Sequence, residues 1–436
     1  MKTFFIFLTT VLLWPFFGHA STIRDAEIEE VLRHISTPIF ESAGLSPENI
    51  DIYIINNPEI NAFVSQGQNI FIHTGLIGLS EDPELIAGVI AHETGHIAGG
   101  HLLSGSASMK GAAIQTAIGY ALGIAAAAIA PEAGMAIATG SEHIARRNLL
   151  KHTRTNEESA DQAGLSYLED VGWSPRGLLK VLDTIYTKQR TLYGEVNPYT
   201  ITHPLSQDRM SFIKNYIQSS PFKSQNMPKN IQKAFARAVI KLKAFLDPYR
   251  DTLRTFPDKD TSFLARYARA IAYYKIPNLE KSLAEIDALL KEYPNDGYAH
   301  ELKGQILFEN GKIKQAIRSY KKAHELLPNV PLIQIEYASS LIATDDKSQS
   351  NLATPLLQQA LTTEKNNAYA WRQLAIVYGR NDQLGLSYTA LAEEAVILGE
   401  QANALRFIKT ARNYVKTGTP ADFRLRDLQK HAEKLK

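Results

Sequence analysis

The sequence predicts a mainly α, α+β protein: a helix-rich domain with a small sheet, followed by an α-solenoid of helical pairs. Three short runs rich in β-branched and aromatic residues lie close together at 51–55, 61–64 and 69–72. An amphipathic helical pattern begins at Pro83. From about residue 260 onward, helical pairs recur with a period of 34 residues, which is typical of a helical repeat array.

The composition limits the possible architectures and partners. The 436 residues are enough for two or three domains, each with its own core. Lys and Arg number 47 against 45 Asp and Glu, and no dense basic run occurs, so we expect no nucleic-acid partner. The chain contains no cysteine. Disulfides, thiolate metal sites and cysteine nucleophiles are therefore excluded, and His, Asp and Glu remain as metal ligands.

Residues 1–20 have the pattern of a cleavable export signal. Lys2 gives a positive start, an apolar core runs from Phe4 to Phe17, and Gly18-His19-Ala20 supplies small residues for cleavage after Ala20. The alternative is a retained membrane anchor, but the apolar core is short of the ~20 residues that a span needs. No cysteine follows that could carry a lipid. We therefore expect the mature protein in a bacterial periplasm, with membrane association left open.

The chain after the signal divides into three predicted parts. Residues 21–225 form an α-rich domain with the small sheet, residues 226–259 a helical linker, and residues 260–436 the repeat domain. Within the repeat domain, tetratricopeptide positions are filled by Gly304, Ala316, Tyr320, Ala323 and Pro328. A second match runs from Trp371 to Tyr378, the period slips around 345–351, and 424–436 forms a capping helix. The concave groove of such an array usually holds peptides or partner proteins.

The stretch His92-Glu-Thr-Gly-His96 predicts a metal site. Two histidines four residues apart lie on one face of a helix, so both imidazoles can reach one ion. Glu93 lies beside them, where it can accept a proton from a metal-bound water. The helix is predicted to begin at Asp82-Pro83-Glu84, with an N-cap, a proline and an acidic first turn. The alternative is an exposed helix whose polar side chains are solvated.

A catalytic zinc needs a third protein ligand from elsewhere in the chain. His101 follows Gly99 and resembles the third histidine of one protease class. It falls one residue early, because Leu102 occupies the expected position, and one residue rotates a side chain by about 100°. Glu157 is the stronger candidate.

Thr155 and Glu158 have capping-box spacing, which predicts a helix start with Glu157 in its first turn and Asp161 one turn further on the same face. This pairing suits a metal ligand plus a carboxylate that orients a ligand imidazole. The alternative is an ordinary solvated helix face.

These motifs together resemble the HtpX/CAAX-protease family of zinc endopeptidases, which are gluzincins with a zincin-like fold. The resemblance covers roughly residues 45–215. It rests on four motifs in order: His92–His96, Glu157-x-x-Ala-Asp161, Asn61-Ala-Phe63 upstream and His203-Pro-Leu-Ser-Gln-Asp-Arg209 downstream.

The resemblance implies one Zn²⁺ held by His92, His96 and Glu157, with Glu93 as the base and Asp161 as the orienting carboxylate. It places His203 and Arg209 near the metal. There they would hold substrate and transition state, or His203 would block the open zinc position at rest.

The predicted function is a periplasmic zinc endopeptidase that cleaves misfolded or stalled envelope proteins, with outer-membrane β-barrels as the client that the resemblance implies. Residues 62–72 are a predicted sheet edge, able to pair with an unfolded substrate strand. The repeat domain would dock substrates or the outer-membrane assembly machinery. The alternatives are a chaperone or assembly adaptor in which the repeat groove dominates, and a structural repeat protein with an inactive zinc fold.

Residues 111–130 contain no charged side chain and are rich in Ala, Gly and Ile. A buried helix or a flap over the active site is the favoured prediction, because the composition is only weakly apolar. Peripheral membrane contact and a true span remain alternatives.

Overall fold

The computed structural model describes residues 22–65, 68–101, 153–191, 199–200, 203–344 and 346–435. The predicted export signal and the segment 111–130 lie outside these residues. The chain divides into two compact units, which are described separately below. Unit 1 comprises the chain up to Arg24, Ser36–Leu79 and Glu84–Asn226; unit 2 comprises Asp25–Ile35, Ser80–Pro83 and Met227–Lys436.

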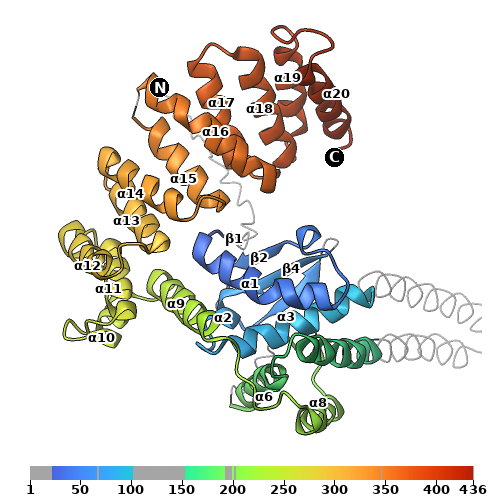
Figure 1. Ribbon diagram of the computed structural model, residues 1–436. Helices are drawn as coiled ribbons and strands as arrows, with labels where there is room; N and C mark the ends of the chain where they lie inside the picture. The colour runs from blue at the N-terminus through green and yellow to red at the C-terminus, as the bar shows by residue number, and fades with distance from the viewer. Residues whose placement is uncertain are drawn as a thin grey trace, which may run out of the picture. The chain divides into compact units, whose positions relative to one another are not determined.

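Unit 1 contains a four-stranded sheet (Figure 1). Its strands are β1 (Thr22–Ile23), β2 (Ile52–Ile55), β3 (Ala62–Ser65) and β4 (Asn69–His73), in the order β1-β2-β4-β3. Strands β2 and β4 pair in parallel, whereas β1 with β2 and β3 with β4 pair antiparallel. The three predicted strands correspond to β2, β3 and β4, while β1 is too short to show a pattern. The prediction that all of 62–72 forms a sheet edge was wrong, because β4 pairs on both sides and β3 alone within this segment is an outer strand.

The sheet buries one set of alternating side chains. Ile70 and Ile72 of β4 are fully buried, as are Ile54 of β2 and Ala62 of β3. Phe71 points to the opposite side and stacks between the rings of neighbouring strands, with centroid distances of 5.1 and 5.2 Å. This period of two is what a pleated strand dictates. Each buried Ile contributes roughly 1.5–3 kcal/mol of hydrophobic stabilisation.

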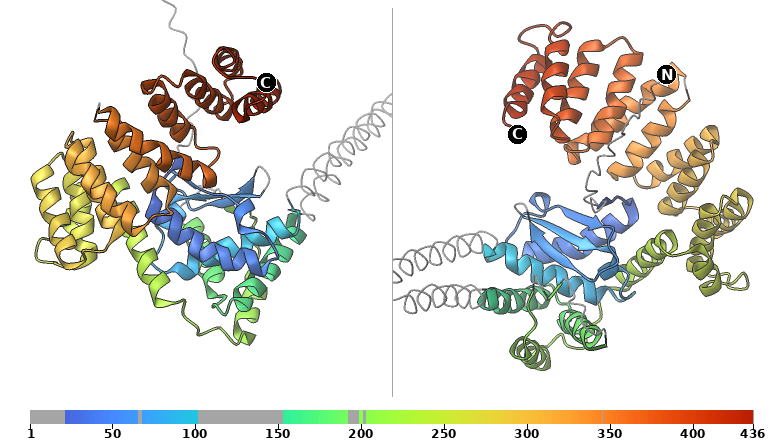
Figure 2. Two further views of the ribbon diagram at one scale, coloured as in Figure 1. Left: turned by 45° about the horizontal axis from the view of Figure 1, so that its top comes forward. Right: turned by 180° about the vertical axis from the view of Figure 1, so that it is seen from behind.

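Helices make up the rest of unit 1. They are α2 (Thr74–Ile77), α3 (Pro83–Ala98), a helix over residues 153–170, α6 (Arg176–Thr191) and α8 (Gln207–Ser219), with a 3-10 turn at Pro47–Asn49. Helix α1 (Ala26–Ser42) contributes its first part to unit 2 and its last part to unit 1. The predicted apolar stripe of α3 is buried from Leu85 to Ile90, so this helix is fixed along its length. Figure 2 shows α3 and the helix 153–170 running side by side.

Unit 2 is a curved array of consecutive helices (Figures 1 and 2). They are α9 (Lys229–Leu246), α10 (Tyr249–Thr255), α11 (Phe263–Lys275), α12 (Leu279–Glu292), α13 (Gly297–Glu309), α14 (Ile313–Leu326), α15 (Pro331–Ile342), α16 (Lys347–Thr363), α17 (Ala368–Arg380), α18 (Leu384–Ile397), α19 (Gln401–Ala411) and α20 (Pro420–Ala432). The residues predicted as a helical linker form α9 and α10 and belong to this unit.

The predicted repeat signature has a packing explanation in the pair α13 and α14. A Cβ on Gly304 would lie 2.7 Å from the ring of Tyr320, so only a very small residue lets that ring pack against α13. Ala316 and Ala323 are fully buried on the same face of α14. The period slip around residue 345 coincides with α16, which has 17 residues where α12 and α14 each have 14.

Buried charges join the start of α1 to the first helices of unit 2. Lys241 of α9 is fully buried and lies 2.8 Å from Asp25 and 3.2 Å from Glu301. Arg237, also on α9, forms ion pairs with Glu27 and Asp296. Since an unpaired buried charge is costly, residues 25–35 are held in unit 2 by these mutual pairs.

No helix in the part of the chain that the structure describes is both long and apolar enough to cross a membrane.

Candidate metal centre

Helix α3 brings His92 and His96 to one face. Their Nε2 atoms lie 3.1 Å apart, and both His92 and the adjacent Glu93 are fully buried. The Nε2 atoms point to the same space, as the four-residue spacing predicts. With Zn–N bonds of about 2.0–2.1 Å, two nitrogens at this separation can share one ion. The structure thus supports a metal site on α3 over a solvated helix face.

The helix over residues 153–170 supplies the third donor. The Oε1 atom of Glu157 is 3.3 Å from His96 Nε2, and its Oε2 atom is 3.4 Å from His92 Nε2. The predicted capping box was wrong, because residues 153 and 154 are already helical and Thr155 is not an N-cap.

Two glycines set the distance between α3 and the helix that carries Glu157. A Cβ on Gly95 would lie 2.7 Å from the carbonyl oxygen of Ala160 and 2.9 Å from its Cα. From the other side, a Cβ on Gly164 would lie 2.9 Å from the backbone nitrogen of His92. The helices therefore touch backbone to backbone at this crossing, which a larger residue would prevent. This close approach brings the Glu157 carboxylate to the two imidazoles.

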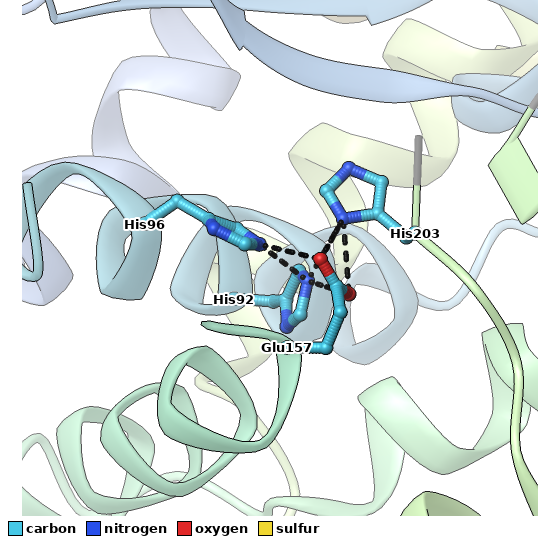
Figure 3. Close-up of side chains that lie close together, drawn as sticks. All are labelled: His92, His96, Glu157 and His203. Carbon is cyan, nitrogen blue, oxygen red and sulfur yellow. Dashed lines mark hydrogen bonds and ion pairs between the residues drawn. The ribbon is translucent and has the colours of Figure 1, made fainter. Parts of the chain in front are cut away.

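His203 completes a group of four donors (Figure 3). Its Nδ1 atom is 3.2 Å from both carboxylate oxygens of Glu157 and 3.2 Å from His92 Nε2. Donor atoms of His92, His96, Glu157 and His203 all lie within 4.8 Å of one another. The backbone N–H of His203 donates to the Tyr199 carbonyl at 2.7 Å, which ties His203 to the residue whose ring packs against it. The sequence motif around His203 thus meets the α3 motif in space.

Asp161 and Arg209 form a second layer behind the donors. Asp161 Oδ1 is 2.9 Å from Nδ1 of His92, and Arg209 donates to both Asp161 oxygens at 2.7 and 2.8 Å. Arg209 also lies 2.9 Å from Glu157 Oε2 and is only 1 % exposed. Ser206 caps α8 by accepting from the Arg209 N–H, which fixes the guanidinium at the start of that helix. The arginine therefore holds both carboxylates in place.

The pKa shifts differ among the groups of the site, and burial lowers the pKa of His96. Burial disfavours the charged form of Asp161, but the hydrogen bonds from Arg209 and His92 outweigh it and lower the pKa of this carboxyl. Despite burial, contacts with His203 and the other imidazoles hold the pKa of Glu157 far below its usual value. Burial opposes charging of His92, yet Asp161 and Glu157 raise its pKa to about 10.

The charge balance provides a test of whether a cation fits. Among the described residues of the site, Glu93, Glu157 and Asp161 carry buried carboxylates, and Arg209 carries the one buried guanidinium. With neutral imidazoles the site has a formal charge of minus two, which a divalent cation would neutralise. Imidazole nitrogens with one carboxylate and no thiolate are a donor set typical of catalytic zinc. The residues present therefore fit a divalent metal ion.

Glu93 has the environment of a proton acceptor. Its two carboxylate oxygens are buried and have no hydrogen-bond partner among the described residues. The Oε1 atom is 3.3 Å from Nε2 of His203, close enough for electrostatic attraction but without hydrogen-bond geometry. Since a buried carboxylate normally has partners, this one is positioned for a group such as water between it and the four donors.

The structure also places residues that the sequence did not single out as site residues. Tyr199 is fully buried with its ring centroid 4.7 Å from that of His203, and burial together with the charge of Glu93 raises its pKa well above 10. Its only sequence signal is a position four residues before His203.

His101, the alternative ligand candidate from the sequence, is outside the group of four and contacts the outer nitrogen of His96. Asn61 is buried at the start of β3, and Phe63 belongs to the aromatic stack of the sheet.

Comparison with known proteins agrees with this geometry. Residues 22–217 match the family described as Peptidase family M48, and residues 286–403 match the cytochrome c-type biogenesis protein H TPR domain. The Beta-barrel assembly-enhancing protease of Escherichia coli (strain K12) is 25% identical, covering 92% of this chain and 82% of the relative. The protein of that name from Yersinia pestis is 23% identical with the same coverage.

A third relative matches a shorter part of the chain. Metalloprotease YcaL of Escherichia coli (strain K12) is 26% identical over 46% of this chain and 75% of the relative. These similarities confirm the predicted combination of a zincin-type metallopeptidase domain with C-terminal tetratricopeptide repeats. They also favour protein–protein contacts for the repeat region.

Proposed function

We propose that this metalloendopeptidase, with a peptidase family M48 domain at residues 22–217 and a tetratricopeptide region after it, is a periplasmic zinc enzyme that cleaves misfolded or stalled envelope proteins. The observation that carries the proposal is the cluster of four donor atoms within 4.8 Å of one another. Beside it lies the buried carboxylate of Glu93, which has no hydrogen-bond partner among the described residues. The export pattern of residues 1–20 supports the periplasm as the compartment.

In this proposal, His92, His96 and Glu157 hold one zinc ion. When bound, zinc would polarise a water molecule and the carbonyl of the scissile peptide bond. Asp161, 2.9 Å from Nδ1 of His92, would orient that ring so that its Nε2 lone pair faces the ion. Arg209 keeps Asp161 and Glu157 ionised and correctly oriented through its charge-assisted hydrogen bonds.

Glu93 acts as the general base and then as the acid. Its carboxylate takes a proton from the attacking water and delivers it to the leaving amine. Burial without hydrogen-bond partners leaves both oxygens available for this transfer. The Nε2 atom of His203 lies 3.3 Å from Oε1 of Glu93, where it can stabilise the negative charge of that carboxylate during the reaction.

The position of His203 supports a closed resting state. Its Nδ1 atom belongs to the same group of donors as the three proposed ligands. A catalytic zinc site keeps one position open for water or substrate, and a fourth imidazole in that position would block it. We propose that His203 withdraws when a substrate or partner binds, after which its ring can stabilise the developing oxyanion.

The substrate is proposed from the relatives and from the sheet. Relatives with 82% of their length matched are named for enhancing β-barrel assembly, so unfolded or misassembled outer-membrane β-barrel proteins are the proposed clients. Strand β3 is an outer strand whose backbone can pair with an extended substrate. The repeat region would dock the substrate or the assembly machinery. Peripheral membrane contact through residues 111–130 remains a prediction.

The substitution Glu93→Gln tests the mechanism, because the amide keeps the shape of the side chain but cannot accept the proton. We expect the variant to retain one zinc per chain and to lose cleavage of a urea-denatured β-barrel protein by about 10²–10⁴-fold, the usual contribution of a general base. Metal content is measured by mass spectrometry and cleavage by gel assay, with chelator-treated wild type as the metal-free control. Cleavage by the variant at the wild-type rate would remove Glu93 from the mechanism.

The adaptor alternative, which the intact donor set does not favour, is tested in cells by comparing Glu93→Gln with a deletion of residues 260–436. If Glu93→Gln maintained the integrity of the envelope as well as the wild type does, and the deletion did not, the repeat groove would be the main functional element.

A further inference from the structure

His101 lies behind His96, on the side away from the other donors. Its Nδ1 atom is 3.0 Å from Nδ1 of His96, and the two ring centroids are 5.0 Å apart at 80°. The other nitrogen of His96, Nε2, is 3.3 Å from Glu157 and faces the proposed ion. His101, which lies one position too early in the sequence to match a metal ligand, therefore contacts the proposed ligand His96 instead.

The contact has a defined hydrogen-bond direction once His96 holds a metal. An imidazole that binds through Nε2 is neutral and keeps its proton on Nδ1, which must then donate. At 3.0 Å, Nδ1 of His101 is the acceptor, and the proton of His101 is on its own Nε2. We propose that His101 is a positioning residue, which fixes the ring orientation and tautomer of His96. This inference rests on the proposed zinc function.

Two glycines between these histidines make the contact possible. A Cβ on Gly99 would lie 2.4 Å from Nε2 of His101 and 2.8 Å from two of its ring carbons, so any larger residue would displace the ring. Gly100 has a φ of +62°, the left-handed conformation that turns the chain after the last residue of α3. This turn brings His101 back toward His96. The pair Gly99-Gly100 thus serves the second layer of the site.

The two ligand histidines consequently have different outer partners. His92 is backed by the carboxylate of Asp161 at 2.9 Å, whereas His96 is backed by the neutral ring of His101. A neutral acceptor orients His96 without adding another negative charge to a site that already contains three buried carboxylates. Outer partners of metal-binding histidines typically change metal affinity by about 10- to 100-fold when they are removed.

The test compares His101→Leu with His101→Asn in the full mature chain. The two side chains are similar in size, but only Asn offers an oxygen acceptor close to the position of Nδ1. Zinc affinity is measured by competition with a chromophoric chelator, and the visible spectrum of the cobalt-loaded protein reports ligand geometry. We expect affinity to fall about 10- to 100-fold with Leu, with an altered cobalt spectrum, and to stay within about threefold of the wild type with Asn.

Gly99→Ala is an independent second variant, because it displaces the His101 ring while leaving the histidine in place. It should weaken zinc binding in the same direction as His101→Leu, and it decides the question if His101→Leu proves unstable. Wild-type affinity in both His101→Leu and Gly99→Ala would overturn the inference, as would equal losses with Leu and Asn, which indicate packing alone. Failure of the wild type to bind zinc or to cleave protein would instead refute the proposed function.

Discussion

Replacing Gly95 by alanine should separate the metal donors without removing any of them. Gly95 lies in the metal-binding turn of α3, where a Cβ would be 2.7 Å from the carbonyl oxygen of Ala160. Ordinary contact begins at 3.4 Å, so the helix over residues 153–170 must move by about 0.7 Å. The obstructing atoms belong to the backbone and cannot rotate away. Glu157 lies one turn before Ala160 and would move with it.

The displacement is large compared with what a metal site tolerates. Ligand distances in metal centres hold to about 0.2 Å, so a shift of 0.7 Å removes Glu157 as an effective ligand. We expect zinc affinity to fall at least about tenfold and proteolysis to fall with it. The forced overpacking costs about 1–3 kcal/mol, and the higher helix propensity of alanine offsets about 1 kcal/mol of that. The metal-free protein should therefore unfold at only a slightly lower denaturant concentration.

Gly88→Ala is the matched control on the same helix. A Cβ on Gly88 would meet the backbone nitrogen of Leu178 at 2.3 Å, a clash at least as severe but against α6 and not against the helix that carries Glu157. Both variants should lose stability in urea unfolding of the metal-free chain, but only Gly95→Ala should lose zinc affinity in chelator competition. Gly164→Ala, which clashes at the same crossing from the opposite helix, should behave like Gly95→Ala. Wild-type zinc affinity in Gly95→Ala would refute this account of the site.

Two further predictions concern buried charges in the two units. Asp161→Asn removes the charge that orients His92, so zinc affinity should fall about 10- to 100-fold in the chelator assay; an unchanged affinity would exclude an orienting role. Burial raises the pKa of Glu301 to about 7, with the charge of Lys241 opposing the rise and that of Asp25 adding to it. Because the folded chain keeps this proton to higher pH than the unfolded chain does, the stability that Glu301 contributes is complete below pH 4.5 and is lost as the pH rises through about 7. Glu301→Gln should therefore reduce the fall in unfolding temperature of the protein between about pH 5 and 8. The proton on Glu301 contributes on the order of 3 kcal/mol at most to the free energy of unfolding. A fall in unfolding temperature as steep as that of the wild type would contradict the raised pKa of Glu301.

Sequence patterns among neighbouring residues were sufficient to predict several helices and strands of this protein and part of its metal site. The stripe from Leu85 to Ile90 and the cap-and-proline start predicted α3, because helix periodicity and N-terminal chemistry are properties of neighbouring residues. The alternation of residues 69–72 predicted β4 for the same reason. The repeat signature was visible in α13 and α14 because Gly304 leaves room for the ring of Tyr320 to pack between the paired helices.

Local patterns failed where a longer-range partner decided the outcome. Thr155 and Glu158 have the spacing of a helix start, but the helix already includes the residues before them. Residues 62–72 have the composition of an edge, but β4 is enclosed because β2, more than ten residues earlier, pairs with it in parallel. The sequence disfavoured His101 as a metal ligand but did not predict its contact with His96, because that contact depends on how Gly99 and Gly100 turn the chain.

The sequence by itself determined which functional groups this protein can use: the imidazoles and the carboxylate of His92–His96, and the carboxylates of Glu157 and Asp161 further along. It also determined the helical repeats, which bury their apolar faces only by stacking on one another. Only the tertiary structure decided that His92, Glu157, His203 and Arg209 meet, since these residues lie up to 117 positions apart. The close crossing at Gly95 and Gly164 brings Glu157 to His92, while Arg209 reaches Glu157 from the start of α8. The physical reason is that side-chain type and helical phase are local properties. The distance between donors on different elements depends instead on backbone contacts across the core, which no local pattern specifies.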